Sequence, residues 1–366
     1  METGFGGTGV GFPTNINRES RMATTLRDIA RELGISVTTV SRGLAGYSDV
    51  AEDTKARIQA TADRLGYTPN LTARRLQKRR TDTLGFILPT LTPRFSDPFF
   101  SEFLAGVGNE AASRGYDLLV SVQAPGSTEE RAAYERAAAG GWVDGLFVVR
   151  TRVNDERITR LCDGNFPFVA FGRTECDCEF PYVDEDSAAG VHQIITHLVD
   201  LGHSAIAFVA PPSYLMFGRY RIQGFYEAMA AHNLEVREKW IIEGDMTQRG
   251  GETAAQSLLA LTERPTAIIF GNDLMAIGGM NGIKATGLQP GVDIAVGGFD
   301  NISLSSYVTP SLTTIEQPIY DIGQRLCTML IDVINERELT ERHVLLSPTL
   351  IVRDSSGPRI QAGSRR

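Results

Sequence analysis

Three short stretches near the start of the chain carry apolar residues at the spacing of amphipathic helices. The first begins at Thr25, which forms a variant of the capping box with Asp28, and Gly34 can supply a left-handed stop. A second helix is expected after Ser36, a good N-cap, and a third over residues 51–65. The pattern therefore predicts a small, independent bundle of three helices.

Beyond Thr83 the pattern changes, and short apolar segments alternate with amphipathic helical segments. The apolar segments read LGFIL, YDLLVSV, DGLFVV, FPFVAF, SAIAFVA, TAIIFG and DIAVGGF. Strands that are apolar on both faces are typical of parallel sheets with helices on both sides. At roughly 100–200 residues per domain, this region has room for two doubly wound α/β subdomains.

Charge is distributed unevenly along the chain. The whole sequence has a net charge of −8, but residues 21–80 carry twelve Lys or Arg against six Asp or Glu, so this segment is +6 and the remainder is −14. Such asymmetry suggests that the basic segment meets a polyanion while the acidic remainder stays away from it. A solvated basic tail is the simpler alternative.

The first two predicted helices are joined by a turn, residues 34–36, that is too short for antiparallel packing. The second helix must therefore cross the first steeply, which is helix-turn-helix geometry. Its outward side chains would be Val37, Thr38, Ser41 and Arg42, which can reach base edges and phosphates in a major groove. A bundle that merely packs is the alternative at this point.

The segment NLTARRLQKRR, residues 70–80, concentrates five basic residues around Leu76. Asn70 can cap two helical turns that would be marginal in isolation and would form on a partner. Guanidinium groups such as that of Arg74 would neutralise phosphates while Leu76 enters between base pairs in a minor groove. A flexible linker remains the alternative.

Polar and aromatic side chains stand near the carboxyl ends of the predicted strands, where a cleft between two α/β subdomains would bind a ligand. Aromatic rings suit the apolar face of a sugar, and Arg and Asp suit vicinal hydroxyls. The candidates are Asp97, Phe99, Phe100, Arg173, Arg221, Asn272 and Asp300. Asp273 is expected to cap a helix.

Several classes of function lack their motifs. The four cysteines are sparse, with only one C-x-C pair, which fits reduced thiols, and no metal or cofactor is expected. Hydrolase, P-loop and zinc-protease motifs are missing, which argues against an enzyme. Neither a membrane span nor a signal peptide is recognisable, so we expect a cytoplasmic protein.

The stretches TLRDIARELGISVTTVSRGLAG and RLGYTPNLTARRL resemble the head and hinge of the lac-repressor (LacI) family of transcriptional regulators. The resemblance continues through SDPFF at 96–100, GNDLMAIG at 271–278, GGFDNIS at 297–303 and LTTIEQP at 312–318, and covers residues 24–354. It implies a homodimer that reads double-stranded operator DNA, with a core similar to periplasmic sugar-binding proteins.

The resemblance also implies roles for particular residues. Base contacts fall on Val37, Thr38 and Arg42, and the minor-groove wedge on Leu76 beside Ala73. Ligand contacts fall on the following residues: Phe99, Phe100, Arg221, Asn272 and Asp300, with Arg173 and Gln317 in addition.

Three positions depart from the family pattern. Gly43 replaces a small apolar residue and should cost the second helix about 1 kcal/mol relative to alanine. Met246 replaces a stacking aromatic residue, which would admit a bulkier ligand. The chain ends in DSSGPRIQAGSRR rather than a leucine heptad, so we expect a dimer.

The sequence thus predicts an α/β protein with an amino-terminal helix-turn-helix head and a core of the periplasmic-binding-protein type. The expected parts are a disordered extension (1–21), the head (22–68), a hinge helix (69–80), the core (81–354) and a tail (355–366). In the core, one subdomain spans about 83–182 plus 318–345 and the other about 183–315 plus 346–354. The expected function is a repressor controlled by a small effector, most simply a sugar. The alternative is a transport-type sugar-binding protein.

Overall fold

The computed structural model describes residues 24–67, 80–90 and 97–358 of the chain. The chain divides into two compact units, with the boundary between Lys78 and Arg79. The predicted extension at 1–21 and all of the predicted hinge except Arg80 lie outside the described residues, so each unit is considered separately below.

The first unit is the predicted three-helix bundle. Its helices are α1 (Leu26–Leu33), α2 (Val37–Leu44) and α3 (Glu52–Arg64). Ile29, Val40 and Ile58 are fully buried at the centre, because the three helices each turn their apolar faces inward. As predicted, Thr25 and Asp28 form a capping box at the start of α1.

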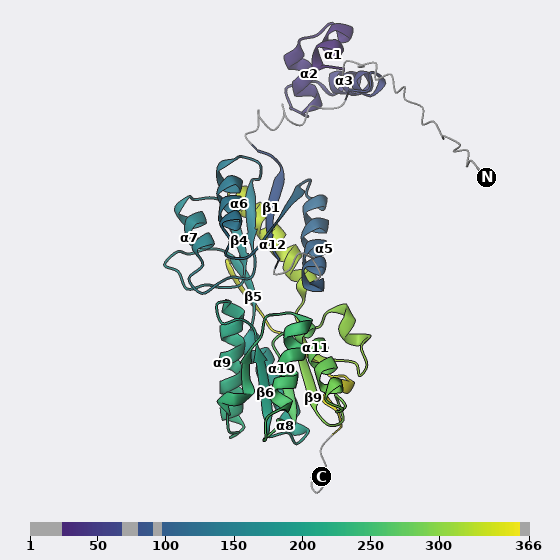
Figure 1. Ribbon diagram of the computed structural model, residues 1–366. Helices are drawn as coiled ribbons and strands as arrows, with labels where there is room; N and C mark the ends of the chain where they lie inside the picture. Colours follow the sequence, from purple (N-terminus) through teal and green to yellow (C-terminus); the bar gives the residue numbers. More distant parts are fainter. Residues whose placement is uncertain (1–23, 68–79, 91–96, 359–366) are drawn as a thin grey trace, which may run out of the picture. The chain divides into compact units, whose positions relative to one another are not determined.

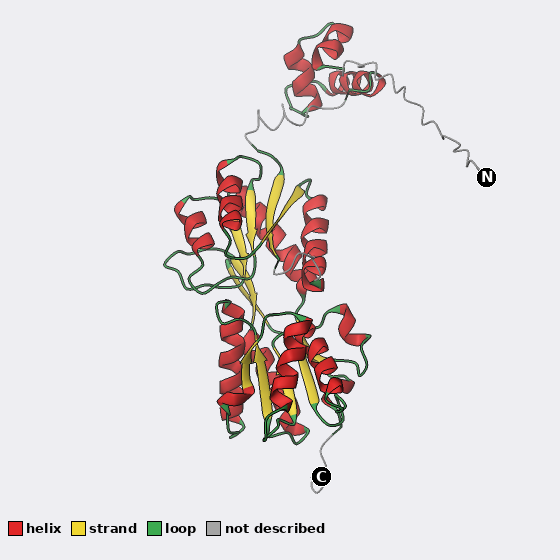
Figure 2. Cartoon of the chain, in the orientation of Figure 1, coloured by secondary structure: helices red, strands yellow, loops and turns green. Residues whose placement is uncertain are grey.

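The second unit contains two lobes, each built on a six-stranded sheet with helices on both faces (Figures 1 and 2). The first sheet has the strand order β11-β5-β4-β3-β1-β2, and all of its strand pairs are parallel. The first lobe comprises β1 (Thr83–Pro89), α5 (Pro98–Ser113), β2 (Asp117–Gln123), α6 (Thr128–Ala139), β3 (Gly145–Val148), α7 (Glu156–Asp163), β4 (Phe168–Phe171), β5 (Tyr182–Glu185), α12 (Ile319–Ile334) and β11 (His343–Leu346).

The second sheet has the order β12-β10-β9-β8-β6-β7, and only β12 runs antiparallel to its neighbour among these strands. The second lobe comprises α8 (Ser187–Asp200), β6 (Ile206–Ala210), α9 (Met216–Ala231), β7 (Ile241–Glu243), α10 (Gln248–Leu259), β8 (Ala267–Phe270), α11 (Asp273–Ala285), β9 (Ala295–Asp300), β10 (Thr313–Glu316) and β12 (Thr349–Ile351), with short 3-10 helices at Glu238–Trp240, Ser303–Ser306 and Asp354–Ser356.

The inner strands of both sheets are buried on both faces, which is why the sequences of β1, β3, β4, β6 and β8 are largely apolar. Along β1, Leu84 and Phe86 pack toward α5 and α12, whereas Ile87 packs toward α6 and α7. In the second lobe α8 and α9 cover one face of the sheet and α10 and α11 cover the other. The doubly wound α/β prediction is confirmed.

The chain passes between the lobes three times, after β5, after β10 and after β11. Strand β5 continues to Glu185 and β11 to Leu346 within the first sheet. The crossings therefore lie slightly later than the boundaries predicted at 182 and 345. The polar end of β5 hid its full length from a search for apolar runs.

Two glycines on α5 offer a matched test of the packing between α5 and α12. A Cβ at Gly106 would lie 2.2 Å from the backbone oxygen of Tyr320, whereas one at Gly108 would meet nothing within 4 Å. We expect Gly106→Ala to lower the free energy of unfolding by about 1–3 kcal/mol through overpacking. Gly108→Ala should raise it by up to about 1 kcal/mol through helix propensity. Urea denaturation of both variants tests this, and equal effects would contradict the tight helix contact.

Candidate nucleic-acid interface and ligand site

The turn between α1 and α2 is fixed by one glycine and one serine. Gly34 adopts a left-handed conformation with φ of 66°, and the following residue, Ile35, donates its N–H to the Ala30 carbonyl at 3.1 Å. The Ser36 hydroxyl then accepts a hydrogen bond from the Thr39 N–H at 3.0 Å. Helix α2 therefore begins at Val37 and leaves the turn in a defined direction.

The outer face of α2 carries the predicted reading residues. Val37 is 40% exposed, Thr38 and Arg42 are exposed, and Ser41 is half-buried. Val40 points the other way and is fully buried in the bundle. The Val37 side chain is suited to apolar contact with a thymine methyl group in a major groove.

Arg42 is held in place by two neighbours that the sequence analysis did not identify. Its guanidinium lies 2.6 Å from an Asp49 carboxylate oxygen and 5.1 Å from the centre of the Tyr47 ring. Both members of the ion pair are about half exposed. Exposed ion pairs contribute only about 0–1 kcal/mol, so Arg42 can exchange this partner for a nucleic acid at little cost.

Gly43 has a packing role in addition to the low helix propensity that the sequence indicated. A Cβ at this position would lie 2.5 Å from the Ile58 Cδ1 atom of α3. The glycine therefore lets α2 and α3 approach closely in the bundle, which offsets the propensity penalty expected from sequence.

The predicted hinge residues Asn70, Ala73, Arg74 and Leu76 lie outside the described residues. The first residues of the core are firmly attached to the first lobe. Arg80 donates to the Ile334 carbonyl at the end of α12 at 2.7 Å, and the Thr81 and Asp82 N–H groups both donate to the Asp144 carboxylate.

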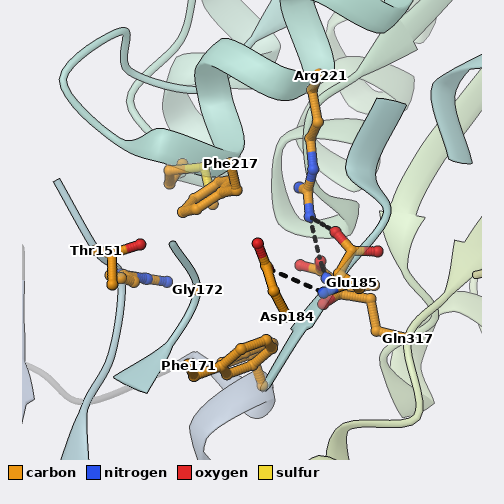
Figure 3. Close-up of a pocket in the computed structure, with 12 residues that line it drawn as sticks. Thr151, Phe171, Gly172, Asp184, Glu185, Phe217, Arg221 and Gln317 are labelled. Carbon is orange, nitrogen blue, oxygen red and sulfur yellow. Dashed lines mark hydrogen bonds and ion pairs between the residues drawn. The ribbon is translucent and has the colours of Figure 1, made fainter. Parts of the chain in front are cut away.

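A pocket lies between the two lobes of the core, at the carboxyl ends of both sheets (Figure 3). It contains about 530 Å³ of space not filled by atoms, part of it open to solvent. The lining residues are Phe99, Arg150, Thr151, Phe171, Gly172, Asp184 and Glu185 from the first lobe, and Phe217, Arg221, Met246, Asp300 and Gln317 from the second.

Aromatic side chains form the apolar walls of the pocket. Phe99 and Phe171 stack with their ring centres 5.8 Å apart, and Phe217 approaches from α9. Met246 lines the pocket as well, at the position where sequence resemblance suggested a missing aromatic ring. Flat apolar surfaces of this kind suit the face of a sugar ring or a planar base.

Arg221 is the central polar group of the pocket. It is 3% exposed, with its guanidinium carbon 3.5 Å from the Phe299 ring centre and 4.8 Å from that of Phe217. It donates to the Gly271 carbonyl and the Ser187 hydroxyl, and to a Glu185 carboxylate oxygen at 3.2 Å. Since Glu185 comes from β5 and Arg221 from α9, this contact joins the lobes.

Two buried carboxylates depend on that guanidinium. Asp300 lies 3.8 Å from Arg221 and accepts a hydrogen bond from the Gln317 amide at 2.6 Å. Burial raises the pKa of Asp300 well above its ordinary value and raises that of Glu185, although Arg221 opposes both shifts. The pocket therefore combines its apolar walls with buried hydrogen-bond acceptors.

Of the ligand residues expected from sequence, Phe99, Arg221, Asp300 and Gln317 line this pocket. Phe100 does not, because it is 1% exposed in the core beneath the Arg150 guanidinium.

The other three expected residues do not line the pocket, and they cap helices or form ion pairs next to it. Asp97 caps α5 by accepting from the Phe99 N–H and forms an ion pair with Arg150. Arg173 forms an ion pair with Asp184 at 2.6 Å. Asn272 caps α11 by accepting from the Met275 N–H, so the expected cap, Asp273, is instead the first residue of that helix.

Asp273 has a different role from the one expected. Its carboxylate accepts hydrogen bonds from the Ser305 and Thr314 hydroxyls and from the Ile302 N–H. Burial raises its pKa to about 6. Asp273 thus connects α11 to residues 302–305, which follow β9, and to β10.

Sequence reasoning missed several lining residues that also follow strands. Arg150 and Thr151 come just after β3, and the sequence analysis had recognised that strand as the apolar segment DGLFVV. Asp184 and Glu185 end β5, which was not recognised because its sequence YVDE is half polar. A search for polar residues at every strand end would have found the first pair.

The described part of the chain contains no group of three or more His, Cys, Asp or Glu side chains that could hold a metal ion. Within the same residues, no helix combines the length and apolar character needed to cross a membrane.

The sequence matches two known families. Residues 25–70 match the bacterial regulatory proteins of the lacI family, and residues 195–356 match the periplasmic binding protein-like domain. The HTH-type transcriptional regulator AglR of Rhizobium meliloti (strain 1021) is 33% identical over 343 residues, which cover 92% of this chain and 95% of AglR.

Solved structures of transcriptional regulators are also similar to this chain. The lac repressor dimer bound to operator and the anti-inducer ONPF is 26% identical with a TM-score of 0.80, covering 92% of this chain and 99% of the repressor chain. The complex of the transcriptional regulator CelR with cellobiose is 28% identical with a TM-score of 0.71, covering 91% and 99% of the two chains.

Arg221 and Arg219 provide a matched pair for testing the buried charge network. Arg221→Met leaves Glu185 and Asp300 buried without their cation and should lower the free energy of unfolding by about 3–5 kcal/mol at pH 7. Arg219→Met removes only an exposed pair with Glu175 and should change it by less than about 1 kcal/mol.

The pH dependence of the same variants gives a second readout. Protonation removes the buried negative charges, and both carboxylates already have raised pKa values in the folded protein. Their unfavourable contribution to the free energy of unfolding is therefore small at low pH and grows as the pH rises. The loss of unfolding free energy in Arg221→Met should thus be smaller at pH 5 than at pH 7. Urea denaturation at both pH values measures it, and a deficit that grows on acidification would refute the assignment.

Proposed function

This chain belongs to the lacI family of bacterial regulatory proteins, and we propose that it is a transcriptional repressor controlled by a sugar. Its head binds double-stranded operator DNA, and its core binds the effector in the pocket between the lobes. The observation that carries this proposal is that one chain combines an exposed reading helix, α2, with an interlobe pocket built around a buried arginine.

On the head, Val37, Thr38, Ser41 and Arg42 are the proposed major-groove contacts. Their exposure on one face of α2 and the weak surface ion pair of Arg42 support this role. Asn70, Ala73, Arg74 and Leu76 are the proposed hinge contacts, with Leu76 entering the minor groove. This part of the proposal rests on sequence.

In the core, the chemistry of the pocket supports a sugar as effector. Its aromatic walls offer apolar faces, and its carboxylates accept hydrogen bonds from hydroxyls. The cellobiose complex of CelR is in line with this choice. Asp97, Phe100, Arg173 and Asn272 act indirectly, by holding the lining residues in place.

The active form is a homodimer, as the dimeric lac repressor suggests. Strand β2, at one edge of the first sheet, carries the exposed apolar residues Leu119, Val120 and Val122, which are 46%, 39% and 52% exposed. An exposed apolar edge strand favours pairing with a second copy, and two heads would read two half-sites.

Effector binding reaches the DNA through the first lobe. A ligand between the lobes changes the angle between them about the three crossing segments. Because Arg80 and Thr81 are fixed to α12 and Asp144, movement of this lobe carries the end of the hinge with it. Coupling of this kind is a differential affinity, typically about 1–3 kcal/mol.

A transport-type binding protein would use a similar core but has no need of a helix-turn-helix head. An enzyme would need a nucleophile, metal or acid–base pair facing the ligand, whereas each carboxylate that lines this pocket is paired with an arginine. A repressor acts where its operator lies, so the proposed location is the cytoplasm.

The direct test is footprinting of the region upstream of the protein's own gene, with and without candidate sugars. We expect a protected, near-palindromic site whose occupancy changes when the correct sugar is added. Protection that is absent under all conditions would end the proposal.

Thr38→Ala should alter base preference. Loss of a contact to a base edge should weaken binding to the selected operator by about 1–3 kcal/mol, or roughly 5- to 150-fold, and relax selection at one base pair in each half-site. Gln59→Ala, on the exposed face of α3, is the control and should leave preference unchanged. Binding to randomised duplexes followed by sequencing measures both, and identical preferences in wild type and Thr38→Ala would remove Thr38 from the interface.

Leu76→Ala should separate specific from nonspecific binding. An apolar wedge contributes only where the duplex is kinked, so specific affinity should fall much more than affinity for random DNA. Fluorescence anisotropy with both duplexes at one salt concentration measures the ratio, and equal losses would eliminate the wedge.

A further inference from the structure

One oxygen of the pocket has no hydrogen-bond partner among the described residues. Glu185 is 2% exposed, and its Oε1 atom accepts from the Ser187 hydroxyl and from Arg221. Its Oε2 atom is buried and accepts from nothing. Buried acceptors are nearly always satisfied, so an orphan oxygen in the lining of a pocket points to a donor supplied by the ligand.

The charges around the pocket are unequal. Among the described residues, the lining side chains and their ion-pair partners include four carboxylates, of Asp97, Asp184, Glu185 and Asp300, and three guanidinium groups, of Arg150, Arg173 and Arg221. Arg150 pairs with Asp97, and Arg173 pairs with Asp184.

Arg221 alone therefore serves two carboxylates. It lies 3.2 Å from Glu185 and 3.8 Å from Asp300, and Asp300 has a second donor in the Gln317 amide. Figure 3 shows Glu185 beside Arg221 at the interlobe crossing after β5. Glu185 is thus the carboxylate whose hydrogen bonding is incomplete.

These two observations limit what the pocket accepts. We propose, on the basis of the function proposed above, that the effector carries no negative charge and donates a hydrogen bond from a hydroxyl or amino group to Glu185 Oε2. A phosphate or carboxylate at that point would face the buried Glu185 carboxylate, which shares the Arg221 guanidinium with Asp300, and would supply no proton. Glu185 is then the residue that selects uncharged or amino sugars over sugar phosphates and sugar acids.

The test uses the full chain and matched sets of compounds. Glucose, galactose, mannose and ribose, with cellobiose and adenosine, form the uncharged set; glucosamine and galactosamine form the amino set; the 6-phosphates and uronic acids of the same hexoses form the anionic set. Thermal shift identifies the binders, and titration calorimetry gives their affinities. The amino set distinguishes an ammonium donor from a hydroxyl donor.

We expect binding by an uncharged or amino compound, and its anionic counterpart should bind at least about 100-fold more weakly. Glu185→Gln places an amide N–H₂ near the ligand's donor, so it should weaken the preferred compound at least about 10-fold and narrow the discrimination against the anion. Glu227→Gln, exposed on α9, is the matched control and should change neither value. If Glu185→Gln does not fold, Glu185→Asp keeps the charge and should retain the rejection of anions with weaker binding.

Two outcomes would overturn the proposal: an anionic compound that binds as tightly as its uncharged counterpart, or a screen in which no uncharged or amino compound binds. Operator footprinting with the same protein preparation distinguishes a failure of this proposal from a failure of the proposed repressor function. A protected operator together with an anionic effector would reject the role of Glu185 alone. Ligand binding without any protected DNA would reject the repressor function and leave the ligand selectivity standing.

Discussion

The interlobe pocket depends on a buried cation, the guanidinium group of Arg221. It lies between the Phe299 and Phe217 rings and is the point at which a carboxylate of the first lobe, Glu185, meets a carboxylate of the second, Asp300. Burying these charges is costly, and it is tolerated only while all three stay together, because each alone would be an uncompensated buried charge. The interlobe pocket is thus held in a defined geometry by the same group that would contact a ligand.

This arrangement makes the pocket sensitive to what occupies it. A ligand that supplies a donor to the acceptor-rich lining changes the balance of contacts between the lobes, which are connected by three crossing segments. The first lobe also holds Thr81 and Asp82, which directly follow the predicted hinge, through Asp144. In the head, by contrast, Arg42 is held by an exposed ion pair with Asp49 and by the Tyr47 ring. The buried contacts of the pocket therefore determine which ligand the core binds. In the head, Arg42 can exchange its exposed ion pair for a contact with DNA.

Sequence reasoning recovered the architecture because its signals are local: helical spacing in the head and apolar runs in the core. It located Phe99, Arg221 and Asp300 because these follow recognisable strands. It could not separate Phe99 from Phe100, because the rotation of α5 decides which ring faces the pocket and which the sheet. Glu185 was missed because its strand ends in polar residues, and its unpartnered oxygen is a property of the assembled lobes.

The central claim is that one small molecule in the interlobe pocket changes the affinity of the head for operator DNA. The most direct measurement is a pair of titrations with the full chain: operator affinity with and without a saturating effector, and effector affinity with and without operator. Thermodynamic linkage predicts the same fold-change in both, within about 5- to 150-fold. Equal operator affinities with and without an effector that demonstrably binds would contradict the account.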